Sequence, residues 1–230
     1  MKTRVFYTEA AYAVGTLLLA LGTALTAYGG FGISMVVAPA YLLHLKLVQL
    51  LPFFSFGAAE YALQALVILV LILTVRKVRS VYFLSFAAAL GYGVILDLCM
   101  TLTGLLPESL PLRIGSYALG VVLCTGGIAL LFRSYLPPAA YELFVKELAR
   151  KLRKPISAVK TVYDCVSLAV ALLMSLVFFG GIEGIGIGTV VCAPIYGTVI
   201  RKFSDLFDKI YVFRDAFSLR TQFEESEETI

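Results

Sequence analysis

Charged residues are scarce in this chain, and histidine is nearly absent. Asp, Glu, Lys and Arg make up 15% of its 230 residues, whereas an ordinary soluble domain has roughly 25%. The one histidine, His44, cannot by itself make a metal site or a catalytic triad. The four cysteines, Cys99, Cys124, Cys165 and Cys192, stand singly, with no C-x-x-C pair. We therefore expect no bound metal, no cofactor and no enzyme activity.

The chain also lacks a nucleotide-binding unit. The stretch "GIEGIGIGTVVCAPIYGTVI" (181–200) is rich in glycine, as dinucleotide-binding loops are, but such a loop needs a βαβ unit of about 30 residues around it. The apolar runs on either side do not supply one. The net charge of +4 comes from basic residues spread over loops that offer no aromatic stacking platform. These features argue against a nucleotide cofactor and a nucleic-acid partner.

Apolar residues dominate instead. Hydrophobic side chains form 60% of the chain and the mean hydropathy is +0.92. One soluble core of this size cannot bury that much apolar surface, so the lipid bilayer is the expected solvent. A transmembrane helix needs about 20 predominantly apolar residues. The sequence therefore predicts an all-α membrane protein with six transmembrane helices, at 8–29, 56–75, 80–104, 114–133, 157–179 and 184–204.

The basic residues predict the orientation of these spans. Lys and Arg gather in the cytoplasmic loops of membrane proteins. With the N-terminus inside, only Lys46 and Arg113 of the 19 basic residues fall on the outer side. We therefore expect both termini in the cytoplasm. The tail, 205–230, begins with an amphipathic pattern typical of a helix on the membrane surface and ends in "EESEETI", an acidic composition typical of disorder.

The two halves of the chain match each other. The stretch "GTLLLALGTAL" (15–25) matches "GVVLCTGGIAL" (120–130) at an offset of 105 residues. Each half holds three spans, an odd number, so the second half must enter the membrane from the opposite side. We therefore predict two inverted three-helix repeats, 1–112 and 113–204, an architecture of many secondary transporters. Further matches pair Tyr41 with Tyr141, Lys46 with Lys146, Tyr61 with Tyr163, and Ser85 with Thr189.

Each half also has an extra short segment between its first and second span. These segments, 31–47 and 134–154, carry Pro39 and the pair Pro137 and Pro138. Short Pro-interrupted segments at matching places point to a transporter's binding site, whereas the alternative is an amphipathic helix on the membrane surface. We favour insertion into the bundle for 31–47, which is apolar, and the surface for 134–154, which carries seven charges.

Small residues recur four positions apart in the last span of each half. Gly184 and Gly188 form one such pair, and Gly93 and Gly197 each end another. This spacing places small residues on one helix face and lets membrane helices approach closely. We expect the third and sixth spans to pack on these faces; a flexible or substrate-exposed backbone is the alternative. The same faces suit packing between two copies, so a homodimer is a further expectation.

Acidic residues stand inside or at the mouth of the predicted spans: Glu60, Asp97, Asp164 and Glu183. A charged side chain at the centre of a membrane helix costs about 3 kcal/mol on insertion scales, so such residues face the bundle interior and suggest function. Glu60 is the candidate for proton coupling, whereas for Asp97 a functional role and a structural ion pair are equally open.

One further group of candidates lies on the fifth span. Asp164 follows Lys160 by four residues, the spacing of an intrahelical pair. It is either a local salt bridge or a carboxylate that binds a proton or substrate, with its pKa set by the lysine. Tyr61 and the repeat-related Tyr163 are candidates for lining a cavity, although tyrosine is equally common at membrane interfaces.

Several short motifs resemble those of one family. They are "GFGIS" (30–34), "SFG" (55–57), Gly93-x-x-x-Asp97, Lys160-x-x-x-Asp164 and "GIGIGT" (184–189). Together they resemble the YitT/YczE-like family of bacterial integral membrane proteins, in a branch of unknown function. The resemblance implies a bacterial inner-membrane protein with about six spans, often described as a transporter. It also implies two further candidate site residues. One is Ser34, and the other is Glu142, the acid that remains where the family typically has a Pro-Gly-Asp motif and this chain has Ala140-Tyr141-Glu142.

These observations predict a small secondary transporter of the bacterial inner membrane. We expect a polar or zwitterionic solute to bind between the two repeats, with Asp97, Asp164 or Glu60 binding it or carrying a coupling proton. The alternative is a membrane-embedded binding subunit or a regulatory scaffold that acts with partner proteins.

Overall fold

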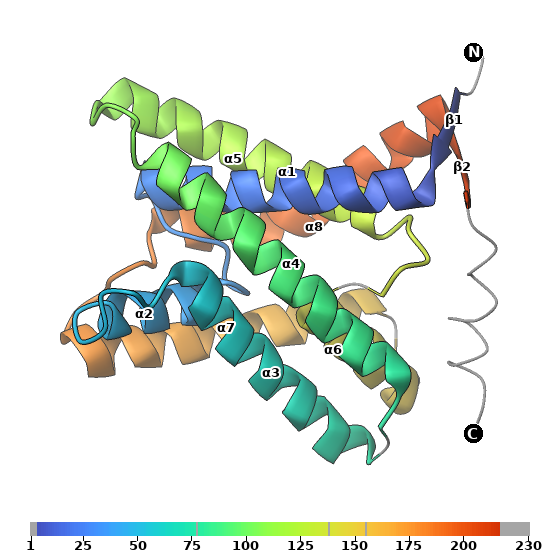
Figure 1. Cartoon of the computed structure of the whole chain (residues 1–230), viewed down its shortest axis with the longest axis horizontal. Helices are drawn as coiled ribbons and strands as arrows, with labels where there is room; N and C mark the ends of the chain where they lie inside the picture. The colour runs from blue at the N-terminus through green and yellow to red at the C-terminus, as the bar shows by residue number, and fades with distance from the viewer. Residues whose placement is uncertain (1–3, 77, 138, 155, 217–230) are drawn as a thin grey trace.

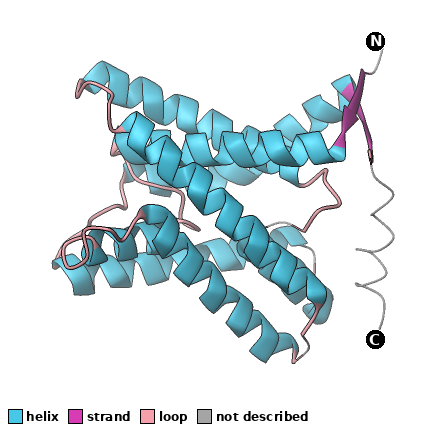
Figure 2. Cartoon of the chain, in the orientation of Figure 1, coloured by secondary structure: helices cyan, strands magenta, loops and turns pink. Residues whose placement is uncertain are grey.

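Helices make up nearly all of the structure. The computed structural model describes residues 4–76, 78–137, 139–154 and 156–216, and Figures 1 and 2 show their arrangement. In chain order the elements are β1 (Arg4–Tyr7), α1 (Thr8–Gly29), α2 (Ala38–Leu47), α3 (Phe56–Val75), α4 (Ser80–Thr103), α5 (Leu110–Leu131), α6 (Ala140–Leu152), α7 (Ile156–Phe179), α8 (Ile187–Ile210) and β2 (Tyr211–Arg214).

The helices α1 and α5 lie against each other along most of their length (Figure 1). Their backbones touch at glycines. A Cβ atom added to Gly22 would lie 2.7 Å from the backbone oxygen of Gly120, and one added to Gly127 would lie 2.7 Å from that of Gly15. Because Gly15 meets Gly127 while Gly22 meets Gly120, the two helices run antiparallel. Their closeness therefore depends on the absence of side chains at these four positions.

The other helices pack at corresponding places in the two halves. The third long helix of the first half, α4, packs on α1, and α8 packs on α5. The short helices α2 and α6 each contact both α3 and α7. In Figure 1, α1, α5 and α8 occupy the upper part of the view and α2, α3, α6 and α7 the lower part, with α4 crossing between them.

Five helices in the described residues are long and apolar enough to cross a membrane: Thr8–Gly29, Phe56–Val75, Val81–Thr103, Leu110–Leu131 and Val159–Phe179. Large apolar side chains such as Leu69, Leu98 and Val166 point outward from them, as expected of surfaces that face lipid. The protein is therefore a multi-pass, all-α membrane protein. The helix α8, expected as the sixth span, is not among the five, and its second half is charged from Arg201 to Lys209. The sixth span stays a prediction.

The start of the tail differs from the sequence prediction. Residues 205–210 continue α8, and the next four form β2, which pairs in parallel with β1 and places Tyr211 opposite Arg4. The helix continues because Phe203, Phe207 and Ile210 keep the spacing of one helix face. The described part of the tail is thus joined to the beginning of the chain. The acidic stretch "EESEETI" lies outside the described residues.

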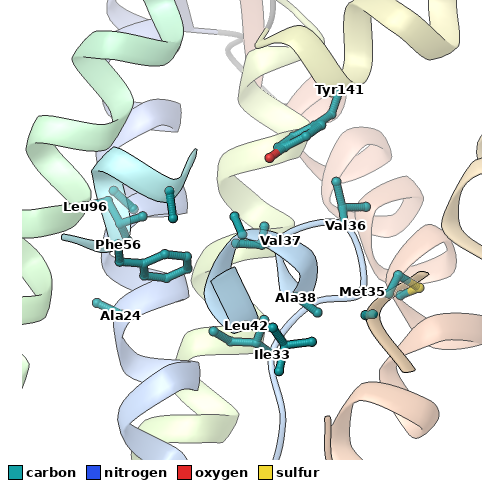
Figure 3. Packing of buried hydrophobic residues seen from close by; sticks show 14 of the residues in the cluster. Ala24, Ile33, Met35, Val36, Val37, Ala38, Leu42, Phe56, Leu96 and Tyr141 are labelled. Carbon is teal, nitrogen blue, oxygen red and sulfur yellow. The ribbon is translucent and has the colours of Figure 1, made fainter. Parts of the chain in front are cut away.

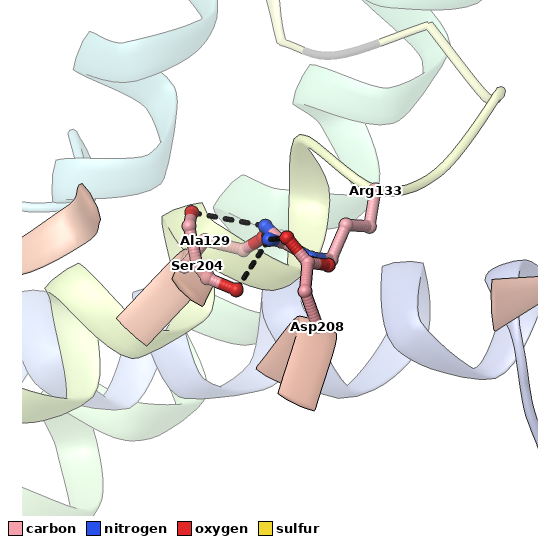
Figure 4. Close-up of polar contacts among 4 residues, drawn as sticks. All are labelled: Ala129, Arg133, Ser204 and Asp208. Atoms are coloured by element: carbon pink, nitrogen blue, oxygen red, sulfur yellow. Dashed lines mark hydrogen bonds and ion pairs between the residues drawn. The ribbon is translucent and has the colours of Figure 1, made fainter. Parts of the chain in front are cut away.

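Arg133, just past the end of α5, ties α5 to α8 (Figure 4). Its Nε donates to Oδ1 of Asp208 at 2.8 Å, and its Nη1 donates to Oγ of Ser204 at 2.9 Å. Nearby, the Tyr135 hydroxyl donates to Oε1 of Glu9 at 2.8 Å. The start of α1, the end of α5 and the end of α8 therefore lie at the same end of the molecule. This is the end that the basic residues predict to be cytoplasmic.

The largest buried cluster includes the segment between α1 and α3 (Figure 3). Ile33, Ala38 and Leu42 are almost fully enclosed, so the expected insertion of 31–47 into the bundle is what the structure shows. The corresponding α6 is amphipathic, as expected, but its apolar side packs on α3 and α7. It is therefore held by contacts with two long helices, and its predicted place on the membrane surface stays a prediction.

We expect Gly22→Ala to lower the free energy of unfolding by about 1–3 kcal/mol, because the new methyl group would overlap the α5 backbone. The matched control is Gly126→Ala on α5, where an added Cβ meets no atom within 4 Å. Alanine favours helix over glycine by about 1 kcal/mol, so this variant should be as stable as the wild type or more stable. Thermal unfolding in detergent compares the two, and equal melting temperatures would contradict the close contact.

Candidate functional site

The main cavity of the described structure gathers polar groups from both halves. It has a volume of about 640 Å³, within the range of small-molecule sites. Its wall is formed by side chains of the long helices α1, α3, α4, α5, α7 and α8, by α6, and by the loops that follow α1 and α5. The polar side chains on this wall include Ser34, Gln64, Tyr141, Glu142, Lys160 and Asp164. Four of these, Ser34, Glu142, Lys160 and Asp164, are residues that the sequence singled out.

A cluster of charged side chains lines the cavity where α6 and α7 meet. Lys160 and Asp164 are one turn apart on α7, and Nζ lies 2.8 Å from Oδ1. Glu142 reaches the same group from α6. Its burial raises the pKa of its carboxyl above the ordinary value, and the ammonium of Lys160 partly opposes this shift. The cavity thus brings the carboxyl groups of Glu142 and Asp164 together with the ammonium group of Lys160, and Lys146 of α6 also lines its wall.

A second polar group stands directly behind this wall. Glu60 of α3 is fully enclosed. Its Oε2 accepts a hydrogen bond from the Tyr141 hydroxyl at 2.9 Å and another from Nε2 of Gln64 at 3.1 Å. The backbone N–H of Ala140 donates to Oε1 of Gln64 at 3.1 Å. Because Tyr141 and Gln64 also line the cavity, Glu60 is separated from it by a single layer of side chains.

Two of the expected site residues lie elsewhere. Asp97 of α4 accepts hydrogen bonds from Oγ of Ser55 at 2.6 Å and from the backbone N–H of Gly57 at 2.7 Å. It therefore binds the N-terminal end of α3, where the helix dipole favours a negative charge. Tyr61 donates to the backbone oxygen of Leu90 at 3.0 Å. Both side chains join α3 to α4 and neither is part of the cavity wall.

Tyr163 lies beside the charged group. Its ring packs 5.6 Å from that of Phe144 on α6, and Nζ of Lys160 lies 5.7 Å from its ring centre. The tyrosine thus supports the lysine through a cation–π contact and fixes α6 against α7.

The glycines predicted to pack the third span on the sixth have other neighbours. A Cβ on Gly93 would overlap the ring of Tyr61 on α3, and one on Gly197 would meet no atom within 4 Å. Gly184 lies in the loop between α7 and α8, and its φ of +66° is outside the range of a regular α-helix. Gly188 is in the first turn of α8, where its backbone N–H donates to the oxygen of Phe31 at 2.8 Å.

This last bond belongs to a contact between two glycine-rich loops. Ile33 N–H donates to the oxygen of Gly184 at 3.3 Å, and Oγ1 of Thr189 donates to the oxygen of Ile33 at 2.8 Å. A Cβ on Gly186 would lie 2.2 Å from the Phe31 oxygen. The two loops therefore touch backbone to backbone, and Gly186 and Gly188 make this close approach possible.

A second pocket, of about 330 Å³, lies beside the same contact. Its wall includes Gly32, Ile33 and Gly186 together with Glu183 and Tyr41. The wall of the main cavity includes the next residue along the chain, Ser34. The loop contact therefore borders the second pocket and is joined directly to the wall of the main cavity.

Comparisons with known proteins give one match. The model of a family of unknown function, DUF6198, matches residues 6–205. Neither the curated proteins nor the solved structures give a match. The link to the YitT/YczE-like family stays a prediction from the short motifs.

We expect Glu142→Gln to stabilise the protein near neutral pH. The folded state raises the pKa of this carboxyl above its ordinary 4.5. The folded protein therefore binds more protons than the unfolded protein, and its stability falls as the pH rises from 4.5 through the raised pKa. The melting temperature of the variant should exceed that of the wild type at neutral pH and match it below 4.5. The control is Glu108→Gln in an exposed loop. A gain that is equal at both pH values would contradict the shift.

We also expect Asp97→Asn to destabilise the protein more than Asp164→Asn. Asp97→Asn removes the negative charge that two hydrogen bonds depend on, and a hydrogen bond to a charged group is worth about 1.5–3 kcal/mol. The partly exposed Lys160–Asp164 pair is worth about 0.5 kcal/mol. Unfolding of the two variants in the same detergent measures the difference, and the reverse order would show that Asp97 has no structural role.

Proposed function

Because the chain belongs to DUF6198, a family of unknown function, we propose its function from the cavity: the protein is a secondary transporter for a small polar or zwitterionic solute. The observation that carries this proposal is the group of Glu142, Lys160 and Asp164 on the cavity wall. Its carboxylates accept hydrogen bonds from an amine, and its ammonium group donates to a carboxylate. The group therefore suits a solute that carries both charges.

The contact between α1 and α5 supports two inverted repeats, 1–112 and 113–204. In the sequence match, Gly15 corresponds to Gly120 and Gly22 to Gly127. Exchanging each residue for its counterpart turns the contact of Gly15 with Gly127 into that of Gly120 with Gly22, which is also made. A two-fold axis between inverted repeats produces a contact that maps onto itself in this way. In this proposal α8 is the sixth span.

The two pockets support a path through the bundle. Inverted-repeat transporters expose one central site to either side of the membrane in turn. Here the contact of Phe31–Ile33 with Gly184–Thr189 borders the second pocket, and the next residue after Ile33, Ser34, lines the main cavity. We take this contact as the closed gate on the outer side. The distribution of basic residues supports an orientation with both termini in the cytoplasm, and the family resemblance of the short motifs supports the bacterial inner membrane.

A thermal-shift screen tests the binding step. Purified protein is heated with amino acids, thiols, polyamines, nucleosides or vitamins, and a ligand at 100 times its dissociation constant adds about 2.7 kcal/mol of stability. We expect one amine-containing class to raise the melting temperature. The increase should disappear in Asp164→Asn and Glu142→Gln and persist in Glu108→Gln, which lies outside the cavity.

Flux measurements in liposomes then separate the two functional classes. Uptake of the bound solute supports a transporter. Binding without uptake would instead support a binding subunit that acts with partner proteins, and the absence of any shift across the panel would favour a scaffold.

We expect Gly186→Ala to open the loop contact, because the added methyl group would overlap the backbone oxygen of Phe31. The reporter is Ser34→Cys on the cavity wall, labelled by a membrane-impermeant thiol reagent added to the outer side. Labelling should rise several-fold in the alanine variant. It should not change in Gly181→Ala, in the same loop, where an added Cβ meets no atom within 4 Å. Equal labelling in both variants would show that these loops do not close the path.

A further inference from the structure

Glu60 differs from the other acidic residues of the bundle in how it is enclosed. Its exposed fraction is 0%, and its two hydrogen-bond donors, Tyr141 and Gln64, both bind Oε2. The other oxygen, Oε1, has no hydrogen-bond partner among the described residues. A buried carboxylate is normally paired with a cation or saturated with donors, and Glu60 is neither.

The groups around Glu60 act in opposite directions: its hydrogen-bond donors favour a negative charge there, whereas burial and a neighbouring acid oppose it. Those that act on it are the polar side chains Tyr141 and Gln64 and the acidic Glu142 on the neighbouring helix α6. The hydroxyl groups of Tyr92 on α4 and Tyr163 on α7 also face it.

Two basic side chains on the neighbouring helices α2 and α7 are directed elsewhere. His44 of α2 stacks on Phe56, one turn before Glu60, and its Nδ1 lies 2.9 Å from the oxygen of Phe54. Lys160 is paired with Asp164. An ionised Glu60 would thus be a buried charge next to a second acid, and no cation among the described residues is paired with it.

We propose that Glu60 is a proton-binding site, protonated at neutral pH, that exchanges its proton with the cavity past Tyr141. The geometry supplies the route, because Tyr141 touches Oε2 of Glu60 and lines the cavity. On release, the carboxyl O–H bond breaks, the proton passes to a water molecule in the cavity, and the carboxylate that remains keeps both Tyr141 and Gln64 as donors. On uptake the same step runs in reverse.

Solute binding and proton release are then linked by electrostatics. A cationic amine bound beside Glu142 brings a positive charge toward Glu60 and favours its ionised form. The solute therefore displaces a proton, and the two move in opposite directions across the membrane. This linkage rests on the proposed transport function, whereas the proton site itself does not.

Infrared spectroscopy of the wild-type protein in lipid nanodiscs tests the proton site without any solute. We expect the carbonyl band of a protonated carboxylic acid at neutral pH, shifted on exchange into deuterated water. The band should be lost in Glu60→Gln and kept in Asp164→Asn and Glu142→Gln. A wild-type spectrum without the band, or a band that survives in Glu60→Gln, would overturn the proposal.

Tyr141→Phe gives an independent assignment if Glu60→Gln does not fold. Removing the hydroxyl takes one donor from Oε2, so the band should shift in frequency and remain present; an unchanged band would show that it belongs to another residue. Because no solute is needed, the outcome is separate from that of the binding screen. A band at Glu60 together with a failed screen would retain the proton site and remove the transport function.

Discussion

The backbone contact between α1 and α5 is the constraint on which the rest of the bundle depends. In lipid, no hydrophobic drive brings helices together, so close packing must supply the attraction. Glycines at four positions let these two helices meet without intervening side chains. The seam is closed at these glycines, and both helices contribute side chains to the wall of the main cavity beside it. The polar wall of the main cavity is found there, with side chains contributed by both halves.

That wall depends most on α6, the segment richest in charge. One side of α6 places Tyr141 and Glu142 toward the cavity and toward Glu60. Farther along the helix, Oε1 of Glu147 accepts from Nη1 of Arg79 at 3.0 Å, in an ion pair that is almost fully enclosed. An ion pair in this setting is costly to break, so it fixes α6 to the start of α4. A helix that is too polar to span a membrane can thereby form part of the interior.

The long elements could be predicted because an apolar run of about 20 residues has few alternatives. The expected spans 8–29 and 56–75 coincide with α1 and α3. The site was harder to predict from the sequence than the helices were. Hydropathy indicates how apolar a helix is, but it does not indicate which neighbour each face of the helix contacts. Asp97 binds Ser55, on a different element, and no spacing within α4 indicates this. Lys160 and Asp164 were predictable as a pair, since i,i+4 spacing fixes their distance, but not their meeting with Glu142.

The helix α8 is attached to α1 at both of its ends. Its first turn is bonded to the loop that follows α1 through Gly188 and Thr189, and its last residue leads directly into β2, which is paired with the strand that precedes α1. If the hydrogen bonds between the two loops break while β1 and β2 stay paired, α8 can rotate as a rigid body about the paired strands. Its 24 residues make an arm of about 36 Å. A tilt of about 10° about these strands would carry the far end through roughly 6 Å, so a small rotation at one edge of the molecule opens a solute-sized gap at the other.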